Sequence, residues 1–229
     1  MKVQGSEALL KSLIKEEVDT VFGYPGGAIM PIYDALYGYM DKINHILTRH
    51  EQGAIHAAQG YSRVSGKVGV CFATSGPGAT NLITGIADAQ IDSTPLVCIT
   101  GQVPSQLLGT DAFQECDVIG ISMPVTKWNY QITNSKEIPE IIAKAFYIAK
   151  SGRPGPVLID ITKDAQFSDT NFKYKKCLKI RSYHPYPIIN KDKVLKAAKL
   201  IDESIKPMIL VGQGVLLSNA EKELIEFSE

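Results

Sequence analysis

A glutamate at the start of an expected helix is the first residue of this chain with a clear capacity for chemistry. Glu51 lies in the run Arg49-His50-Glu51-Gln52-Gly53-Ala54, directly after an expected strand at residues 43–48. Small and aromatic residues then recur at the spacing of one helical face, namely Ala54, Ala57, Ala58 and Tyr61. A carboxylate among such apolar neighbours suits proton transfer, because burial favours its protonated form. The simpler interpretation is that an acidic residue here only complements the helix dipole.

Three glycine-rich turns accompany Glu51, and each follows an apolar run, at residues 21–28, 70–81 and 96–104. Gly26 and Gly27 lack a Cβ atom, so a flat ligand can approach their backbone closely, although a plain turn would also use them. The segment Gly76-Pro77-Gly78-Ala79-Thr80-Asn81 nearly imitates the GxGxxG dinucleotide motif. Asn81 replaces the third glycine, and no acidic residue is well placed about 20 residues later. We therefore exclude a nicotinamide site and expect a structural or interface role for this loop.

Taken together, these segments resemble the large catalytic subunit of acetohydroxyacid synthase (acetolactate synthase), a thiamine-diphosphate enzyme. The resemblance continues through residues 109–115, 126–130 and 151–157, in the order that the family shows. It covers essentially the whole chain. Each piece alone is a weak signal, whereas seven pieces in register are a strong one.

The resemblance implies roles for the residues around the cofactor. Glu51 matches the carboxylate that hydrogen-bonds the aminopyrimidine ring and so promotes loss of the C2 proton of the thiazolium. Gly26 and Gly27 match positions beside the two rings, and Ala28 begins the helix that follows. Gln114 matches a polar contact to the cofactor and the reacting oxygen atoms, although its type and position alone would also suit a surface residue.

Two further groups of residues match family positions. The substrate and inhibitor channel is implied at Ala28, Pro104, Ala112, Phe113 and Lys127. Contacts to FAD, a structural cofactor in this family, are implied at Ser93, Arg153 and the turn Gly212-Gln213-Gly214. Arginine suits a diphosphate because its fork donates parallel hydrogen bonds. Read alone, Lys127 is also an ordinary surface lysine, and Arg153 precedes a stiff Pro-Gly-Pro loop.

The implied reaction decarboxylates pyruvate on thiamine diphosphate and transfers the two-carbon unit to a second 2-oxo acid, in branched-chain amino-acid biosynthesis. The Gly-Asp-Gly segment that holds Mg²⁺ and the diphosphate in such enzymes does not occur here. The resemblance places it in a third domain beyond residue 229, so we expect this chain to be part of a longer protein with half an active site. It also implies a homodimer or homotetramer and a small regulatory subunit.

Other functions remain open at this point. The alternatives within the class are a pyruvate oxidase, a catabolic acetolactate-forming enzyme and a sulfoacetaldehyde acetyltransferase. Glyoxylate carboligase is disfavoured, because that relative lacks the carboxylate seen at Glu51. A different class of function is a truncated, non-catalytic module that only dimerises or regulates.

Composition restricts the partners further. The formal net charge is +0, with 45% hydrophobic and 21% charged residues, so we expect neither a nucleic-acid nor a membrane partner. No leader or long apolar span is recognisable, and we expect a cytoplasmic protein. The four cysteines form no CxxC pair, and the four histidines have no metal-ligand spacing, so neither a disulfide framework nor a zinc site is expected.

Strand-like and helix-like segments alternate, which predicts an α/β fold with a mostly parallel sheet flanked by helices. We expect strands at 18–22, 43–48, 68–74, 96–100 and 157–161, and helices at 6–17, 79–91 and 135–150. The resulting pyrimidine-binding domain would span residues 1–164, followed by a lysine-rich linker at 165–190. Residues 191–229 would begin a second α/β domain, with helices at 192–204 and 220–227, a strand at 207–211 and a tight turn at 212–214.

Overall fold

The strands of the first part of the chain form one six-stranded sheet in the order β3-β2-β4-β5-β7-β6, and every neighbouring pair is parallel. A computed structural model describes residues 1–229 as two units, Met1–Pro185 and Tyr186–Glu229. The sheet belongs to the first unit. Its strands are β2 (Thr20–Gly23), β3 (Asn44–Leu47), β4 (Gly69–Ala73), β5 (Leu96–Gln102), β6 (Trp128–Ile132) and β7 (Pro156–Thr162).

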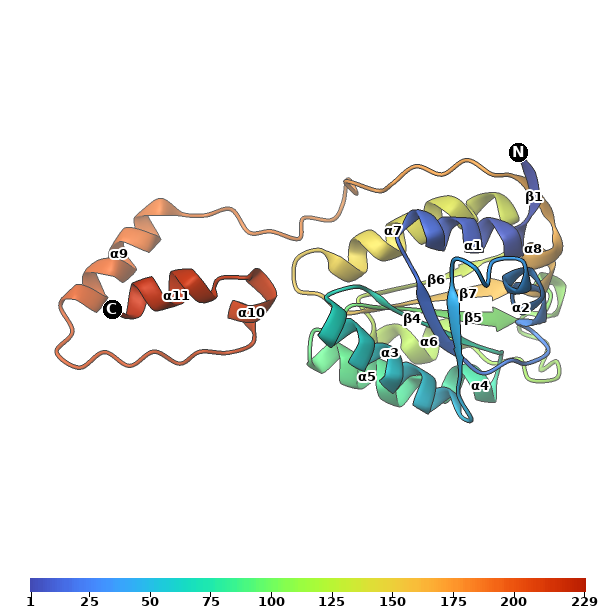
Figure 1. Cartoon of the computed structure of the whole chain (residues 1–229), viewed down its shortest axis with the longest axis horizontal. Coiled ribbons are helices and arrows are strands. Elements are labelled where there is room, and N and C mark those ends of the chain that lie inside the picture. The colour runs from blue at the N-terminus through green and yellow to red at the C-terminus, as the bar shows by residue number, and fades with distance from the viewer. The chain divides into compact units, whose positions relative to one another are not determined.

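Helices cover both faces of this sheet, with α1 and α7 on one face and α3 and α5 on the other (Figure 1). The predicted parallel α/β architecture is therefore confirmed. The helices of the first unit are α1 (Gly5–Lys15), α2 (Met30–Tyr37), α3 (Glu51–Ser65), α4 (Pro77–Thr80), α5 (Ile83–Ile91), α6 (Val118–Ser122), α7 (Ile138–Lys150) and α8 (Lys163–Phe167). Three short 3₁₀ turns lie at Ser105–Leu107, Met123–Val125 and Ser135–Glu137.

Strand β4 contributes side chains to the hydrophobic cores on both faces of the sheet. Val70 and Phe72 pack on the side of α1 and α7, whereas Cys71 and Ala73 pack on the side of α3 and α5. Successive side chains of a strand point to opposite faces, so a strand buried on both sides must be apolar throughout. The expectation of doubly buried strands is correct for β4 and β5, where every residue is buried.

Helix α3 forms where the sequence predicts it. His50 is its N-cap, and the His50 Nδ1 atom accepts a hydrogen bond from the Gln52 backbone at 3.1 Å. Gly66 ends the helix in the left-handed conformation, with φ of 71°. Glu51 is consequently the first helical residue, only a few residues after strand β3.

The expected helix at 79–91 is interrupted. The structure has α4 and α5 instead, separated by Asn81 and Leu82. The Leu82 N–H bonds to the carbonyl three residues back, at Ala79, rather than four back. This tighter turn separates the two helices and places Asn81 between them.

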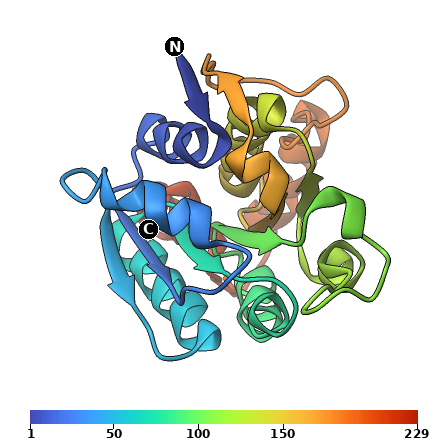
Figure 2. The same cartoon turned by 90° about the vertical axis from the view of Figure 1, so that its right-hand side faces the viewer.

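The first unit extends past the expected boundary at residue 164. Strand β8 (Asp169–Asn171) pairs antiparallel with β1 (Lys2–Gln4), and the two lie side by side in Figure 2. The Gly5 N–H also bonds to the Ser168 carbonyl at 3.0 Å. Residues 165–172, expected to open a linker, are therefore packed against the N-terminus, a long-range pairing that has no local signature in sequence.

The second unit contains only helices, namely α9 (Lys191–Asp202), α10 (Gly214–Ser218) and α11 (Glu221–Ser228). The strand predicted at 207–211 is wrong for this structure, because those residues have no regular secondary structure. Met208 and Leu210 are 91% and 95% exposed, and no other strand of the unit offers them backbone partners. No helix of the chain is both long and apolar enough to cross a membrane.

At Gly5, helix α1 packs too closely against α8 to leave room for a side chain. A Cβ atom at Gly5 would lie 2.0 Å from the Ala165 carbonyl oxygen, whereas one at Gly60 in α3 would meet nothing within 4 Å. We expect Gly5→Ala to lower the free energy of unfolding by about 1–3 kcal/mol, because backbone must shift. Gly60→Ala, the matched control, should raise it by about 0.5–1 kcal/mol through helix propensity. Urea denaturation measures both, and equal effects would contradict this account of the α1–α8 contact.

Candidate active site

The chemistry-bearing segments of the first unit converge at the carboxyl edge of the sheet. Parallel strands end at the same edge, and open α/β sheets bind their ligands there. The glycine turn after β2, the start of α3 after β3, and the Thr74–Gly78 segment after β4 all lie at this edge. The loop 103–116, which follows β5, completes the arrangement.

Glu51 is buried there with a single polar side-chain partner. The residue is 7% exposed, and its Oε2 atom accepts a hydrogen bond from the Asn81 amide at 2.9 Å. Glu51 takes part in none of the ion pairs of the chain. Its carboxylate is thus oriented by Asn81 and by the first turn of α3, while no cation neutralises it.

Thr74 packs against two of the glycines at this edge, and the sequence analysis missed it. Its Oγ1 atom accepts a hydrogen bond from the Ala28 backbone at 3.2 Å. Added Cβ atoms would lie 2.5 Å from the Thr74 Cβ atom at Gly26 and 2.7 Å from its Cγ2 atom at Gly78. The available signal was position alone, since Thr74 is the first residue after a fully buried strand.

The glycines therefore have distinct functions. Gly26 and Gly78 admit the Thr74 side chain, and a Cβ atom at Gly78 would also lie 3.2 Å from the Glu51 Oε1 atom. Gly27 faces open space, with nothing within 4 Å of its Cβ position. The result is an open strip of backbone near a buried carboxylate, which suits a flat polar ring.

The loop that carries Gln114 packs against Gly76, in the segment Thr74–Gly78 that follows β4. Gly76 has φ of 56°, and a Cβ atom there would lie 2.5 Å from the Gln114 carbonyl oxygen. Gln114 itself has φ of 58° and is exposed, as is Phe113 at 88%. Ala112 shares this loop, and Pro104 lies near its start, so this loop alone brings four of the predicted site residues to the carboxyl edge with Glu51.

Tyr33 adds a hydroxyl group beneath this edge. Its ring packs edge-on against Phe72, with centroids 6.1 Å apart, and its buried hydroxyl has no hydrogen-bond partner. Burial raises the pKa of Tyr33 well above its ordinary value, with smaller contributions from the nearby Cys71 and Glu51. The hydroxyl therefore stays protonated and neutral.

Ser93 and Arg153 lie together, but at the amino edge of the sheet, before β5 and β7. The Arg153 guanidinium donates to the Ser93 hydroxyl at 2.8 Å and to the Ile91 carbonyl at 2.9 Å. A third bond reaches the Gln90 carbonyl at 3.2 Å. Arg153 thus caps the C-terminus of α5, where a cation is favourable.

Lys127 does not lie with the other predicted channel residues. It directly precedes β6 at the amino edge, and its ammonium group donates to the carbonyls of Ile148 and Ser151 at the end of α7. Burial lowers the pKa of Lys127. The structure therefore separates Lys127 from Pro104, Ala112 and Phe113, because residues before and after parallel strands lie at opposite edges.

The turn Gly212-Gln213-Gly214 belongs to the second unit, at the start of α10. The Val215 N–H bonds to the Gly212 carbonyl at 3.3 Å, so the expected turn is present. Its three residues are exposed. Their flavin contact stays a prediction.

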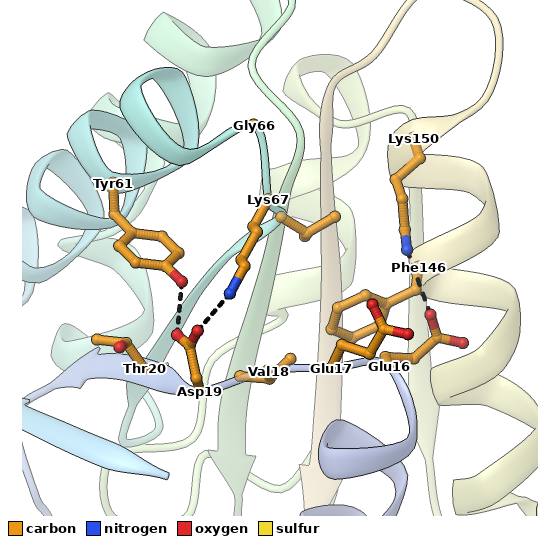
Figure 3. A pocket seen from close by; sticks show the side chains of 11 residues that line it. Glu16, Glu17, Val18, Asp19, Thr20, Tyr61, Gly66, Lys67, Phe146 and Lys150 are labelled. Carbon is orange, nitrogen blue, oxygen red and sulfur yellow. Dashed lines mark hydrogen bonds and ion pairs between the residues drawn. The ribbon is translucent and has the colours of Figure 1, made fainter.

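A separate pocket of about 160 Å³ lies at the amino edge of the first unit (Figure 3). Four of its five charged groups pair with one another, and only Glu17 forms no ion pair. Asp19 accepts hydrogen bonds from Lys67 and from the Tyr61 hydroxyl, the latter at 2.5 Å. Glu16 lies 3.4 Å from the Lys150 ammonium. These internal pairs favour a structural function, and the pocket contains none of the predicted site residues.

Comparison with known proteins gives one family and many relatives. Residues 3–121 match the family described as "Thiamine pyrophosphate enzyme, N-terminal TPP binding domain". The "Acetolactate synthase large subunit" of Corynebacterium glutamicum is 52% identical over 228 residues, which is 100% of this chain and 36% of that protein.

Two further relatives agree. The "Probable acetolactate synthase large subunit" of Methanocaldococcus jannaschii is 52% identical over 230 residues, covering 99% of this chain and 39% of its own length. The "Acetolactate synthase" of Mycobacterium bovis is 50% identical over 228 residues, covering 100% of this chain and 37% of its own length. The chain thus spans between 36% and 39% of these relatives.

The amino-edge pocket makes a pH-dependent contribution to stability. Hydrogen bonds from Lys67 and Tyr61 lower the pKa of Asp19 from 3.8 to about 2. The depressed pKa means that this stabilisation is present above pH 4 and is lost as the pH falls through 2. We expect Asp19→Asn to lower the free energy of unfolding by about 0.5–1 kcal/mol at pH 6, since the pair is partly exposed.

The difference in free energy of unfolding between Asp19→Asn and the wild type should fall toward zero between pH 4 and pH 2, as measured by urea denaturation at each pH. Asp41→Asn is the control, because Asp41 is exposed and forms no ion pair. If Asp19→Asn lowers the free energy of unfolding by the same amount at every pH, the hydrogen-bonded Asp19 carboxylate is not the source of the stabilisation.

Proposed function

The chain belongs to the thiamine pyrophosphate enzymes through its N-terminal TPP binding domain, and from this we propose that Glu51 is the carboxylate that serves the cofactor ring. We further propose that the complete enzyme is an acetolactate synthase. It would decarboxylate pyruvate and transfer the two-carbon unit to a second 2-oxo acid. The observation that carries the proposal is the buried, unneutralised Glu51 carboxylate beside an open strip of glycine backbone.

The residues at the carboxyl edge fit the ring end of thiamine diphosphate. Gly27 leaves open space where any other residue would place a Cβ atom, and Thr74 occupies the space that Gly26 and Gly78 leave free. When bound, thiamine diphosphate supplies the carbon nucleophile for decarboxylation of 2-oxo acids. The protein has to supply one proton-handling group, and the buried candidate at this edge is Glu51.

Asn81 determines how Glu51 handles that proton. The Asn81 amide occupies Oε2, at 2.9 Å, so Oε1 remains free to hydrogen-bond a ring nitrogen. Asn81 also fixes the plane of the carboxylate before any ligand arrives, which lowers the reorganisation that proton transfer requires. We propose Asn81 and Thr74 as the residues that hold this half of the site in place.

The other cofactors follow from the family resemblance. No group of acidic, histidine or cysteine side chains in the chain could hold a metal ion, and we propose that Mg²⁺ and the diphosphate are bound by a later domain of the enzyme. We propose FAD contacts at Ser93, Arg153 and residues 212–214. Ser93 and Arg153 already lie 2.8 Å apart, which supports a common contact surface.

The assembly and domain arrangement are also proposals. Phe113 is 88% exposed, and such an apolar side chain on the loop beside Glu51 favours cover by another subunit. We propose a homodimer or homotetramer in the cytoplasm, with a small regulatory subunit. The first unit would be the pyrimidine-binding domain, and residues 191–229 would begin the FAD-associated domain. Ala28, Pro104, Ala112 and Phe113 would line the channel to the cofactor.

Replacing Glu51 tests the function directly. We expect Glu51→Gln in the complete enzyme to slow acetolactate formation from pyruvate by about 100-fold or more, because a positioned proton-transfer group is removed. Glu140→Gln, which changes an exposed carboxylate on α7, is the control and should retain full activity. Acetolactate release is measured with saturating thiamine diphosphate, Mg²⁺ and FAD. Near-normal turnover of Glu51→Gln would refute the assignment, and a wild-type enzyme that forms no acetolactate would refute the reaction.

A further inference from the structure

A fully buried carboxylate lies in the sheet, away from Glu51. Asp160 on β7 is 0% exposed. Its Oδ1 atom accepts from the Thr100 hydroxyl at 2.6 Å, and its Oδ2 atom accepts from the amides of Gln102 at 3.1 Å and Gln131 at 2.9 Å. These donors come from β5 and β6, the two neighbours of β7. A carboxyl group is buried in a folded protein only when such donors satisfy its oxygen atoms. The three donors are therefore a requirement for placing Asp160 in the sheet.

Gln102 connects this cluster to the loop that carries Gln114. Its Nε2 atom donates not only to Asp160 but also to the Cys116 carbonyl, at 3.0 Å. Its Oε1 atom accepts from the Val103 N–H at 2.9 Å. Val103 begins the loop 103–116 and Cys116 ends it, so one buried amide holds both ends of the loop.

The interior of the loop needs this restraint. Gly109, Asp111 and Gln114 all have positive φ angles, of 74°, 55° and 58°, which is costly for the two non-glycine residues. Inside the loop, the Glu115 carboxylate accepts hydrogen bonds from the N–H groups of Gly109 and Asp111, at 3.0 and 3.2 Å. An exposed loop with such a backbone keeps one conformation only if its ends are fixed.

We propose that Gln102, held by Asp160, is a positioning residue that sets the place of Gln114 by joining the two ends of the loop 103–116. The proposal rests on the proposed function only for what Gln114 does there. Gln102 itself is 0% exposed and touches no reacting group. Its contribution is to hold the loop against Gly76, where the Gln114 backbone packs.

Gln131 provides a matched control. It is the same residue type and donates to the same Asp160 Oδ2 atom, at 2.9 Å. Its side chain forms no hydrogen bond to the loop. Gln131→Met therefore removes one hydrogen bond to Asp160 Oδ2 and nothing else. Gln102→Met removes an equivalent hydrogen bond to the same oxygen atom together with both loop contacts.

Chymotrypsin cleavage after Phe113 in the 229-residue chain measures the freedom of the loop without reference to activity. We expect Gln102→Met to accelerate this cleavage about 10-fold, because two hydrogen bonds that restrain the loop are lost. Gln131→Met should be cleaved at nearly the wild-type rate. Equal rates for the two variants, whether both fast or both slow, would overturn the proposal. If Gln102→Met does not fold, Gln102→Asn replaces it, since it keeps an amide beside Asp160 while its side chain, one methylene shorter, moves the amide out of hydrogen-bond distance of the Cys116 carbonyl.

Kinetics of the complete enzyme give the second readout. We expect Gln102→Met to lower kcat about 10-fold with a smaller change in KM, and Gln131→Met to change neither. A loss of kcat that is equal in both variants would identify a merely structural cluster and overturn the proposal. If the wild-type enzyme proves to have another activity, the cleavage result still stands and decides whether Gln102 holds the loop.

Discussion

The parallel alignment of six strands is the constraint on which the rest of the first unit depends. Both faces of the sheet are buried under helices, so the residues of β4 and β5 are buried throughout and face the two cores alternately. Polar chemistry is therefore displaced to the ends of the strands. Because the strands are parallel, the loops that follow β2, β3, β4 and β5 meet at one edge, and Glu51, Gly26, Thr74 and Gln114 become neighbours there.

The two edges of the sheet consequently have different characters. At the carboxyl edge, Glu51 is buried without a cation, and glycines leave backbone open for a ligand. At the amino edge, charged groups are paired or used as caps, as with Asp19 and Lys67 or Arg153 and the end of α5. The proposed positioning residue Gln102 joins the buried sheet to the carboxyl edge, because its amide bonds both to Asp160 and to the two ends of the loop 103–116.

Local patterns predicted much of this arrangement. The five strands expected in the first domain, helix α3 and the position of Glu51 at its start are confirmed, since each depends on periodicity or on capping. Strand β6 was missed because it is a half-buried edge strand of mixed polarity. Thr74, Asn81 and Gln102 act through contacts with residues far away in sequence, and Lys127 lies at the opposite edge from Pro104. The predicted strand at 207–211 failed because an apolar run becomes a strand only beside another strand.

In the proposed function, Glu51 handles the proton that activates the cofactor. The most direct measurement is the exchange rate of the C2 proton of bound thiamine diphosphate, followed by NMR in deuterated water with the complete enzyme and Mg²⁺. We expect Glu51→Gln to slow this exchange by about 100-fold or more relative to the wild type, while the cofactor stays bound. Equal exchange rates in the two proteins would contradict it.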